Sequence, residues 1–233
     1  MANKMANGLN SNMVKECGLN AGASVVGIAA SKDFVRAPEG FKPSDNLEGC
    51  VSVVVLGAPI PQEALLANPI GFIDIRSALN VKMTEIAKNV AKRIKAEGYK
   101  AKAINGMGGK WINGMQSGHI SMKHAAELAG LGIIGKNYLL TNPQYGNLLW
   151  FSAVLTDAEL MPDKKSPKII NCKSCNKCVE MCPSKALDNP ALFGKKGCSE
   201  TMFKKINNKW EIMCCLCRKV CPYCFGLPKG TKK

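Results

Sequence analysis

The feature that most constrains this chain is a pair of cysteine runs close to its C-terminus. The first run has the spacing C-x-x-C-x-x-C-x-x-x-C-P, and the second has C-x-x-C-x-x-x-C-P. Two-residue gaps let a tight loop wrap around one compact metal centre, and the proline stops each run from folding back. The runs and one isolated cysteine between them lie at Cys172, Cys175, Cys178 and Cys182, then Cys198, then Cys214, Cys217 and Cys221.

The first run has the spacing of bacterial two-cluster ferredoxins, in which three cysteines bind one 4Fe–4S cluster and the fourth binds the other. Exchange of the fourth cysteines predicts two ligand sets. Set 1 consists of Cys172, Cys175, Cys178 and Cys221, and set 2 of Cys182, Cys198, Cys214 and Cys217. Cys198 supplies the ligand that the second run lacks. Cys215 and Cys224 are spare, and either could replace a neighbour in set 2.

Structural zinc is the main alternative, because zinc sites also use C-x-x-C pairs. Three closely spaced cysteines followed by C-P are rare in zinc sites, and this disfavours zinc. Disulfides are disfavoured as well, because the first residues of the chain lack the apolar stretch of a signal peptide. A cytoplasmic, reducing location is therefore expected. Cys17 and Cys50 lie in apolar surroundings and are expected to be buried, inert thiols.

The distribution of the cysteines also predicts the domain organisation. Ten of the twelve cysteines among the 233 residues follow position 170, so we expect an α/β domain over residues 1–165 and a small ferredoxin-like domain over 166–233. Residues 161–167 form the expected linker. No apolar run is long enough to span a membrane.

The net charge of +15 is strongly basic. Two 4Fe–4S clusters with four thiolates each would lower it only to about +11. Such a charge favours an acidic partner, either an electron donor such as flavodoxin or ferredoxin, or a nucleic acid. The alternative is a lysine-rich surface that only keeps the protein in solution.

Apolar periodicity predicts alternating helices and strands, and hence an α/β sandwich. The expected helices cover residues 9–20, 79–94 and 122–128, and the expected strands cover 24–29, 50–57, 99–104 and 148–156. The helix over 79–94 has a continuous apolar stripe and ends at Gly98. Stretches rich in Gly, Pro or Asp are expected to be loops over 31–49, 58–72 and 105–118.

Other motifs give weaker signals. Gly130, Gly132 and Gly135 match G-x-G-x-x-G, but they follow an expected helix instead of a strand, which disfavours a dinucleotide site. His119 and His124 are five residues apart, so they would lie on different faces of a helix and would not share a metal.

Residues 124–146 contain A-G-L-G-I-I-G-K-N-Y-L-L, which resembles the A-G-L-G-x-x-G-K-N-x-L-L signature of epoxyqueuosine reductases, a family distantly related to reductive dehalogenases. Further similarity lies in residues 22–29, 47–57 and 156–160. An isolated cysteine sixteen residues after the first C-P, here Cys198, also recurs in that family. The similarity covers nearly the whole chain.

The resemblance implies a cobalamin-binding, nitroreductase-like α/β domain followed by a two-cluster ferredoxin domain. The nearer cluster would reduce the corrinoid cobalt, which then reduces a substrate. By position, Gly132, Gly135, Lys136 and Asn137 would form the loop beside the corrin ring, where glycines allow a planar macrocycle to approach the backbone. Two alternatives remain: these glycines only form a turn, or a flavin replaces the corrinoid.

Two departures from the family pattern bear on the substrate. The family has an Asp-Ser pair where this chain has Gln116-Ser117, and glutamine cannot donate a proton as a carboxylic acid does. The extra C-terminal helical domain of many members is also not seen, so a short member is expected. The first hypothesis is a cobalamin-dependent reductase acting on tRNA or on another substrate. The second is an electron-transfer protein, or a reductase serving a separate corrinoid protein, with no substrate of its own.

Overall fold

The computed structural model describes residues 8–66, 69–107, 110–112, 115–166, 170–188 and 196–227. The chain forms two compact units, each assembled from separate stretches. Unit 1 consists of Met1–Ala58, Asn80–Leu131 and Trp150–Ser166, and unit 2 of Pro59–Leu79, Gly132–Leu149 and Pro167–Lys233. The last passage from unit 1 to unit 2 therefore falls after Ser166, within the expected linker.

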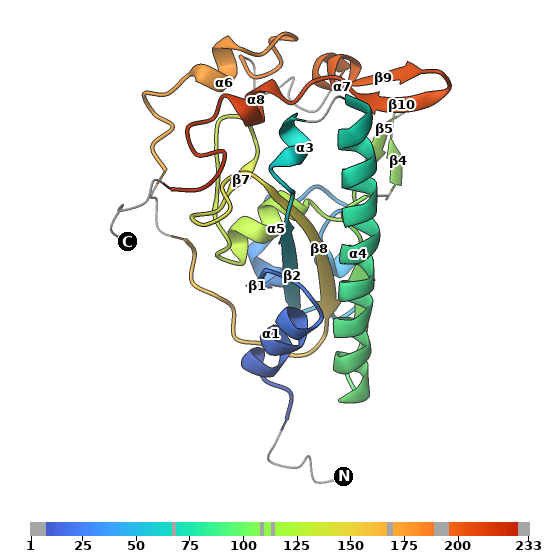
Figure 1. Ribbon diagram of the computed structural model, residues 1–233. Helices are drawn as coiled ribbons and strands as arrows, with labels where there is room; N and C mark the ends of the chain where they lie inside the picture. Colours follow the sequence, from blue (N-terminus) through green and yellow to red (C-terminus); the bar gives the residue numbers. More distant parts are fainter. Residues whose placement is uncertain are drawn as a thin grey trace. The chain divides into compact units, whose positions relative to one another are not determined.

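Unit 1 is built on a four-stranded sheet (Figure 1) with the strand order β1-β2-β8-β3. The strands are β1 (Val25–Ala30), β2 (Ser52–Pro59), β8 (Leu149–Thr156) and β3 (Ala101–Ile104). β1 pairs antiparallel with β2, and β3 with β8. The start of β2 meets the end of β8, where Val51 N donates to Thr156 O over 2.9 Å. The four predicted strands are confirmed, and the apolar runs of β2 and β8 form the buried centre of this sheet between the edge strands β1 and β3.

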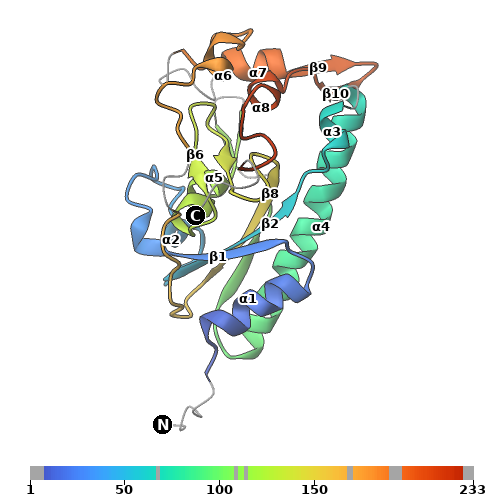
Figure 2. The ribbon, with the colours of Figure 1, turned by 60° about the vertical axis from the view of Figure 1, so that its left-hand side comes forward.

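Helices cover both faces of the sheet, as Figure 2 shows for α1 (Ser11–Asn20), α4 (Pro69–Ala96) and α5 (Met122–Leu128). Gly18 of α1 lies against Val26 of β1, whereas the next strand residue, Gly27, lies against the backbone of Ala129 at the end of α5. Neighbouring strand residues face opposite sides of a sheet, so α1 and α5 occupy opposite faces. The mixed α/β class predicted from the sequence is confirmed.

The long helix α4 follows the predicted apolar stripe but begins ten residues earlier than expected. Met83, Val90 and Ile94 are each 0% exposed, and burying each such side chain stabilises the fold by about 1.5–3 kcal/mol. Pro69 stands at the first helical position, which tolerates proline because no N–H is needed there. The expected loop over 58–72 is therefore wrong in part, since it also contains α3 (Glu63–Leu66).

Two further loop predictions need correction. Within 105–118, β4 (Lys110–Ile112) pairs antiparallel with β5 (Met115–Ser117), around residues 113 and 114, which lie outside the described part of the chain. The stretch 31–49 contains a 3-10 turn, η1 (Ser31–Asp33), and the short helix α2 (Pro43–Asn46). Of the two upstream cysteines, Cys50 is buried as predicted, whereas Cys17 is only half-buried. In the residues that the structure describes, no helix has both the length and the apolarity to cross a membrane.

Besides α3 and the first turns of α4, the described part of unit 2 contains short elements. They are β6 (Ile133–Ile134), β7 (Leu140–Thr141), α6 (Lys177–Glu180), α7 (Lys196–Met202), β9 (Phe203–Ile206), β10 (Lys209–Ile212) and α8 (Leu216–Lys219). β9 and β10 form a hairpin, and both turn residues, Asn207 and Asn208, have positive φ angles of 47° and 65°. Such a turn matches the twist of the flanking strands. The guanidinium of Arg76, from the first turns of α4, lies 5.4 Å from the ring centre of Phe203.

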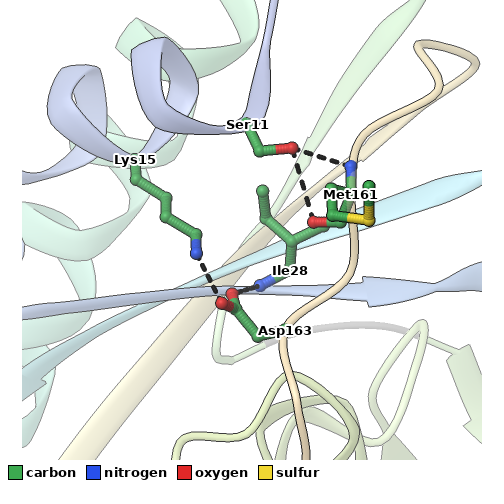
Figure 3. A network of polar contacts seen from close by, with 5 residues as sticks. All are labelled: Ser11, Lys15, Ile28, Met161 and Asp163. Atoms are coloured by element: carbon green, nitrogen blue, oxygen red, sulfur yellow. Dashed lines mark hydrogen bonds and ion pairs between the residues drawn. The ribbon is translucent and has the colours of Figure 1, made fainter.

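A polar network fixes the segment that leaves unit 1 (Figure 3). The Asp163 carboxylate accepts a hydrogen bond from Ile28 N in β1 over 2.9 Å and forms an ion pair with Lys15 of α1. The Ser11 hydroxyl accepts from Met161 N over 2.7 Å. These contacts attach residues 161–163 to both α1 and β1. They thereby anchor the start of the segment that leads to the cysteine-rich region.

We expect Asp163→Ala to lower the free energy of unfolding by about 1.5–3 kcal/mol, because it leaves Ile28 N and Lys15 without their partner. Denaturation by urea, followed by circular dichroism, measures the change. Glu85→Ala is the matched control, since the Glu85–Lys88 pair is exposed on both sides and is worth at most about 0.5 kcal/mol. Equal losses in the two variants would show that the Asp163 network does not stabilise unit 1.

Candidate metal centres and the adjoining loop

The two cysteine runs fold into the same local structure. In the first run Val179 N and Glu180 N donate to Asn176 O, and in the second Arg218 N and Lys219 N donate to Cys215 O. Each run therefore forms one short helix, α6 or α8, with a cysteine in its first turn and a C-P pair after it. The two helices pack against each other. This internal repeat is the arrangement that the exchange of fourth cysteines requires.

All four cysteines of set 1 line one small cavity of unit 2. The lining consists of Gly135, Lys136, Asn137, Thr141, Cys172, Cys175, Lys177, Cys178, Cys221, Pro222 and Tyr223. Cys221 comes from the second run, some forty residues after the other three. The fold thus brings the fourth predicted ligand to the first run.

The electrostatics of set 1 suit a cationic centre. Burial raises the pKa of the Cys178 thiol, and the neighbouring Cys221, Cys172 and Cys175 raise it further. Burial likewise raises the pKa of Cys221, although hydrogen bonds from Tyr223 N and the Asn147 side chain oppose the increase. Four thiolates so close together repel one another unless metal charge neutralises them. The donor set fits a 4Fe–4S cluster, which binds thiolates and supplies that charge.

The members of set 2 also gather. Cys182 is 8% exposed, and Cys198 and Cys217 pack against the apolar cluster to which it belongs. Burial raises the pKa of Cys217 to about 11, opposed by Arg218 and reinforced by Cys198 and Cys214, which places those thiols nearby.

Cys182 differs from its neighbours in its hydrogen bonds. Burial acts to raise the pKa of its thiol, but the Ser184 hydroxyl and three backbone N–H groups, of residues 184, 186 and 187, lower that pKa overall. The Ser184 Oγ lies 3.5 Å from the sulfur. N–H groups directed at a sulfur stabilise its anion and are one of the means by which a protein tunes a cluster.

The two spare cysteines occupy different environments. Cys224 is 2% exposed, and its sulfur lies 3.6 Å from Asn147 Oδ1. Burial raises the pKa of its thiol to about 11, so it remains protonated at neutral pH. Cys215 is half-buried at the N-cap of α8, and burial raises the pKa of its thiol as well.

Among the described residues, no three His, Cys, Asp or Glu side chains stand close enough to hold a single metal ion. The assignment of the cysteines to clusters therefore depends on their spacing, their shared cavity and their mutual electrostatics. The two histidines do not join them. The His124 ring instead lies 2.7 Å from the Ser121 hydroxyl, at the start of α5.

The loop predicted to adjoin a corrin ring lies beside the set 1 cysteines. A Cβ atom on Gly135 would lie 3.5 Å from Cys172 Sγ, and one on Gly132 would meet the backbone of Thr141 at 2.4 Å. Lys136 Nζ donates to Lys173 O over 3.0 Å and to Asn176 Oδ1 over 2.7 Å. The buried Asn137 amide donates to Cys217 O over 3.0 Å.

A second anchor, which the sequence reasoning missed, lies a few residues further along. Asn147 is 2% exposed, its backbone N–H donates to Cys224 O over 3.1 Å, and its amide donates to Arg218 O over 3.2 Å. Asn137 and Asn147 therefore both hold the second cysteine run. The only sequence signal for them was their position in and just after the A-G-L-G stretch.

Gln116, at the position of the family's acid, lies in β5, and Ser117 ends that strand. The Gln116 side chain lies outside the described part of the structure. The match of Gln116 to the position of the family's acid therefore stays a prediction from the sequence.

The chain thus combines a mixed α/β unit with a unit that carries two cysteine runs. No family model matches the chain. The resemblance to epoxyqueuosine reductases is confirmed by curated relatives. The enzyme of Atelocyanobacterium thalassa is 31% identical over 142 residues, which is 52% of this chain and 46% of that protein. The enzyme of Bacillus subtilis is 30% identical over 119 residues, 46% of this chain and 30% of that protein.

Solved structures share the fold. Epoxyqueuosine reductase from Streptococcus thermophilus matches with a TM-score of 0.64 and 18% identity, over 95% of this chain and 68% of that one. The catabolic reductive dehalogenase NpRdhA matches with a TM-score of 0.61 and 23% identity, over 91% of this chain and 31% of that one. An epoxyqueuosine reductase bound to an epoxyqueuosine-modified tRNA-Tyr stem loop is similar as well, with a TM-score of 0.62 and 18% identity over 91% of this chain and 64% of that one. The chain spans less than half the length of these curated relatives.

Proposed function

We propose that this chain is an iron–sulfur oxidoreductase in which two 4Fe–4S clusters deliver electrons to a corrinoid. Set 1 would hold one cluster and set 2 the other. The corrinoid would be bound beside Gly132, Gly135, Lys136 and Asn137, in a nitroreductase-like domain over residues 1–165 that precedes a ferredoxin-like domain over 166–233. Because free thiols bind iron only where they stay reduced, we place the protein in the cytoplasm.

One observation carries the proposal: Gly135, Lys136 and Asn137 line the same cavity of unit 2 as the four set 1 cysteines. A ligand at this loop would lie next to the first cluster, close enough to accept an electron from it. When bound, a corrinoid supplies a low-potential cobalt centre for the reduction of substrate. Gly132 allows the loop to pack closely against the backbone of Thr141, and Asn137 fixes the loop to the second run through Cys217 O.

The protein's own charges favour an acidic electron donor. The net charge of +15 and the lysines at the cavity, Lys136 and Lys177, would attract a flavodoxin or a ferredoxin. A tRNA is a second candidate partner, because a similar epoxyqueuosine reductase binds a tRNA stem loop. The flavin alternative gains no support from the similar proteins.

A second candidate function is electron transfer without a substrate site, for example to a separate corrinoid protein. Gln116 favours this second function. A similar epoxyqueuosine reductase from Bacillus subtilis has a catalytic loop that carries an aspartate, and a glutamine cannot donate a proton as an aspartic acid does.

Titration of the oxygen-free, iron-loaded protein with cob(II)alamin distinguishes the two functions. We expect saturable binding at micromolar concentration with about one cobalt per chain, seen by absorbance and by metal content after gel filtration. FMN, added in the same way as a control, should not be retained. An iron-loaded protein that retains no cobalamin but exchanges electrons rapidly with flavodoxin would contradict the corrinoid site and support the second function.

A further inference from the structure

Arg218 is a charged residue between a ligand of one proposed cluster and a ligand of the other. It follows Cys217 of set 2 and precedes Cys221 of set 1 by three residues, on α8. The repeat of the two runs places Val179 at the equivalent position of α6. The first run therefore shows that the local fold does not need an arginine at this point.

The guanidinium is held by a buried partner. Arg218 Nη1 donates to Asn147 Oδ1 over 3.3 Å, and Asn147 Nδ2 donates back to the backbone oxygen of Arg218 over 3.2 Å. Asn147 is only 2% exposed and Arg218 is half-buried, so the charge is partly shielded from bulk solvent. The next residue, Lys219, carries the same charge but is exposed.

The charge acts on thiols of both sets. Arg218 interacts electrostatically with Cys217 and Cys221, as well as with the spare Cys215 and Cys224. A guanidinium remains protonated in proteins even when burial opposes its charge, so it is a permanent positive charge at this place. Accepting an electron makes a cluster more negative, and a fixed positive charge in a partly desolvated site stabilises that reduced form.

We propose that Arg218, oriented by Asn147, raises the reduction potentials of both clusters and so makes them easier for the donor to reduce. This inference rests on the proposed function, because it presupposes two clusters. Only the second run would raise the potentials in this way, because the first run has the uncharged Val179 at the equivalent position.

The test is a redox titration with dithionite under exclusion of oxygen, followed by electron paramagnetic resonance, on wild type, Arg218→Gln, Arg218→Lys and Lys219→Gln. Arg218→Gln should shift the one-electron reduction equilibrium of both clusters about tenfold towards the oxidised form, which equals about 59 mV. Arg218→Lys keeps the charge and should stay within about threefold of wild type. Lys219→Gln should leave the midpoints unchanged, because water and salt screen its exposed charge.

A shift in Arg218→Gln no larger than that in Lys219→Gln would overturn the role of Arg218, provided that each holds about eight iron atoms. If Arg218→Gln loses iron, Arg218→Lys decides, since a tenfold shift with the charge retained would overturn the electrostatic argument. A wild-type protein without iron would instead overturn the proposed function.

Discussion

Cys178→Ser should lose about four of the eight iron atoms expected per chain, together with the absorbance of one cluster. Cys178 is 9% exposed, and it interacts electrostatically with the other three members of set 1. A serine hydroxyl is a much poorer ligand for iron than a thiolate, so cluster 1 should not assemble stably. Iron and acid-labile sulfide, measured on oxygen-free protein, give the result directly.

The adjacent pair Cys214 and Cys215 provides the matched control for ligand assignment. Cys214→Ser should remove the second cluster, whereas Cys215→Ser should keep about eight iron atoms, because Cys215 lies outside the proposed ligand sets. Both variants remove one sulfur from the same turn before α8. Equal iron loss in the two variants would contradict set 2 as assigned, and full retention by Cys214→Ser together with iron loss in Cys215→Ser would identify Cys215 as the ligand.

Gly146→Ala should damage the second cysteine run although residue 146 is not a ligand. Its φ of +59° lies in the left-handed region, and an added Cβ would stand 2.1 Å from Cys224 O and 2.4 Å from Gly226 N. The backbone must then separate from the end of the run, which Asn147 N and Pro143 O now hold through hydrogen bonds. We expect a loss of about 2–4 kcal/mol in stability and a lower iron content.

Gly98→Ala is the control for this variant. Gly98 has a φ of +85°, but an added Cβ would meet nothing within 4 Å. It should cost only the about 1–2 kcal/mol of a left-handed alanine and leave the iron content unchanged. The comparison, by chemical denaturation and iron analysis, separates backbone strain from the clash. Similar losses in both variants would show that contact between Gly146 and Cys224 is unimportant.

The helices and strands that were predicted correctly are those set by the apolar pattern of their own residues. The apolar runs of β2 and β8 and the stripe of α4 are buried as their periodicity predicted. The early start of α4 was missed because Pro69 and Gly71 suggested a loop. The β4–β5 hairpin was missed although Asn113-Gly114 is a strong hairpin signal, because the density of glycines around it was given more weight.

The cysteine sets could be proposed from the sequence because iron–sulfur ligation imposes short, fixed spacings. The hydrogen bonds that anchor the second run could not be predicted, since they join residues distant in sequence. Asn137 contacts Cys217 across 80 positions and Asn147 contacts Arg218 across 71, and neither pair leaves a periodic trace. The predicted corrin loop gave no hint that Lys136 would be anchored to Lys173 and Asn176.

Iron and acid-labile sulfide, quantified together on protein purified without oxygen, test the central claim most directly. Two sets of four thiolates predict about eight atoms of each per chain and a brown protein. Colourless protein that contains zinc and neither iron nor sulfide would contradict both clusters, and with them the electron path proposed for this chain.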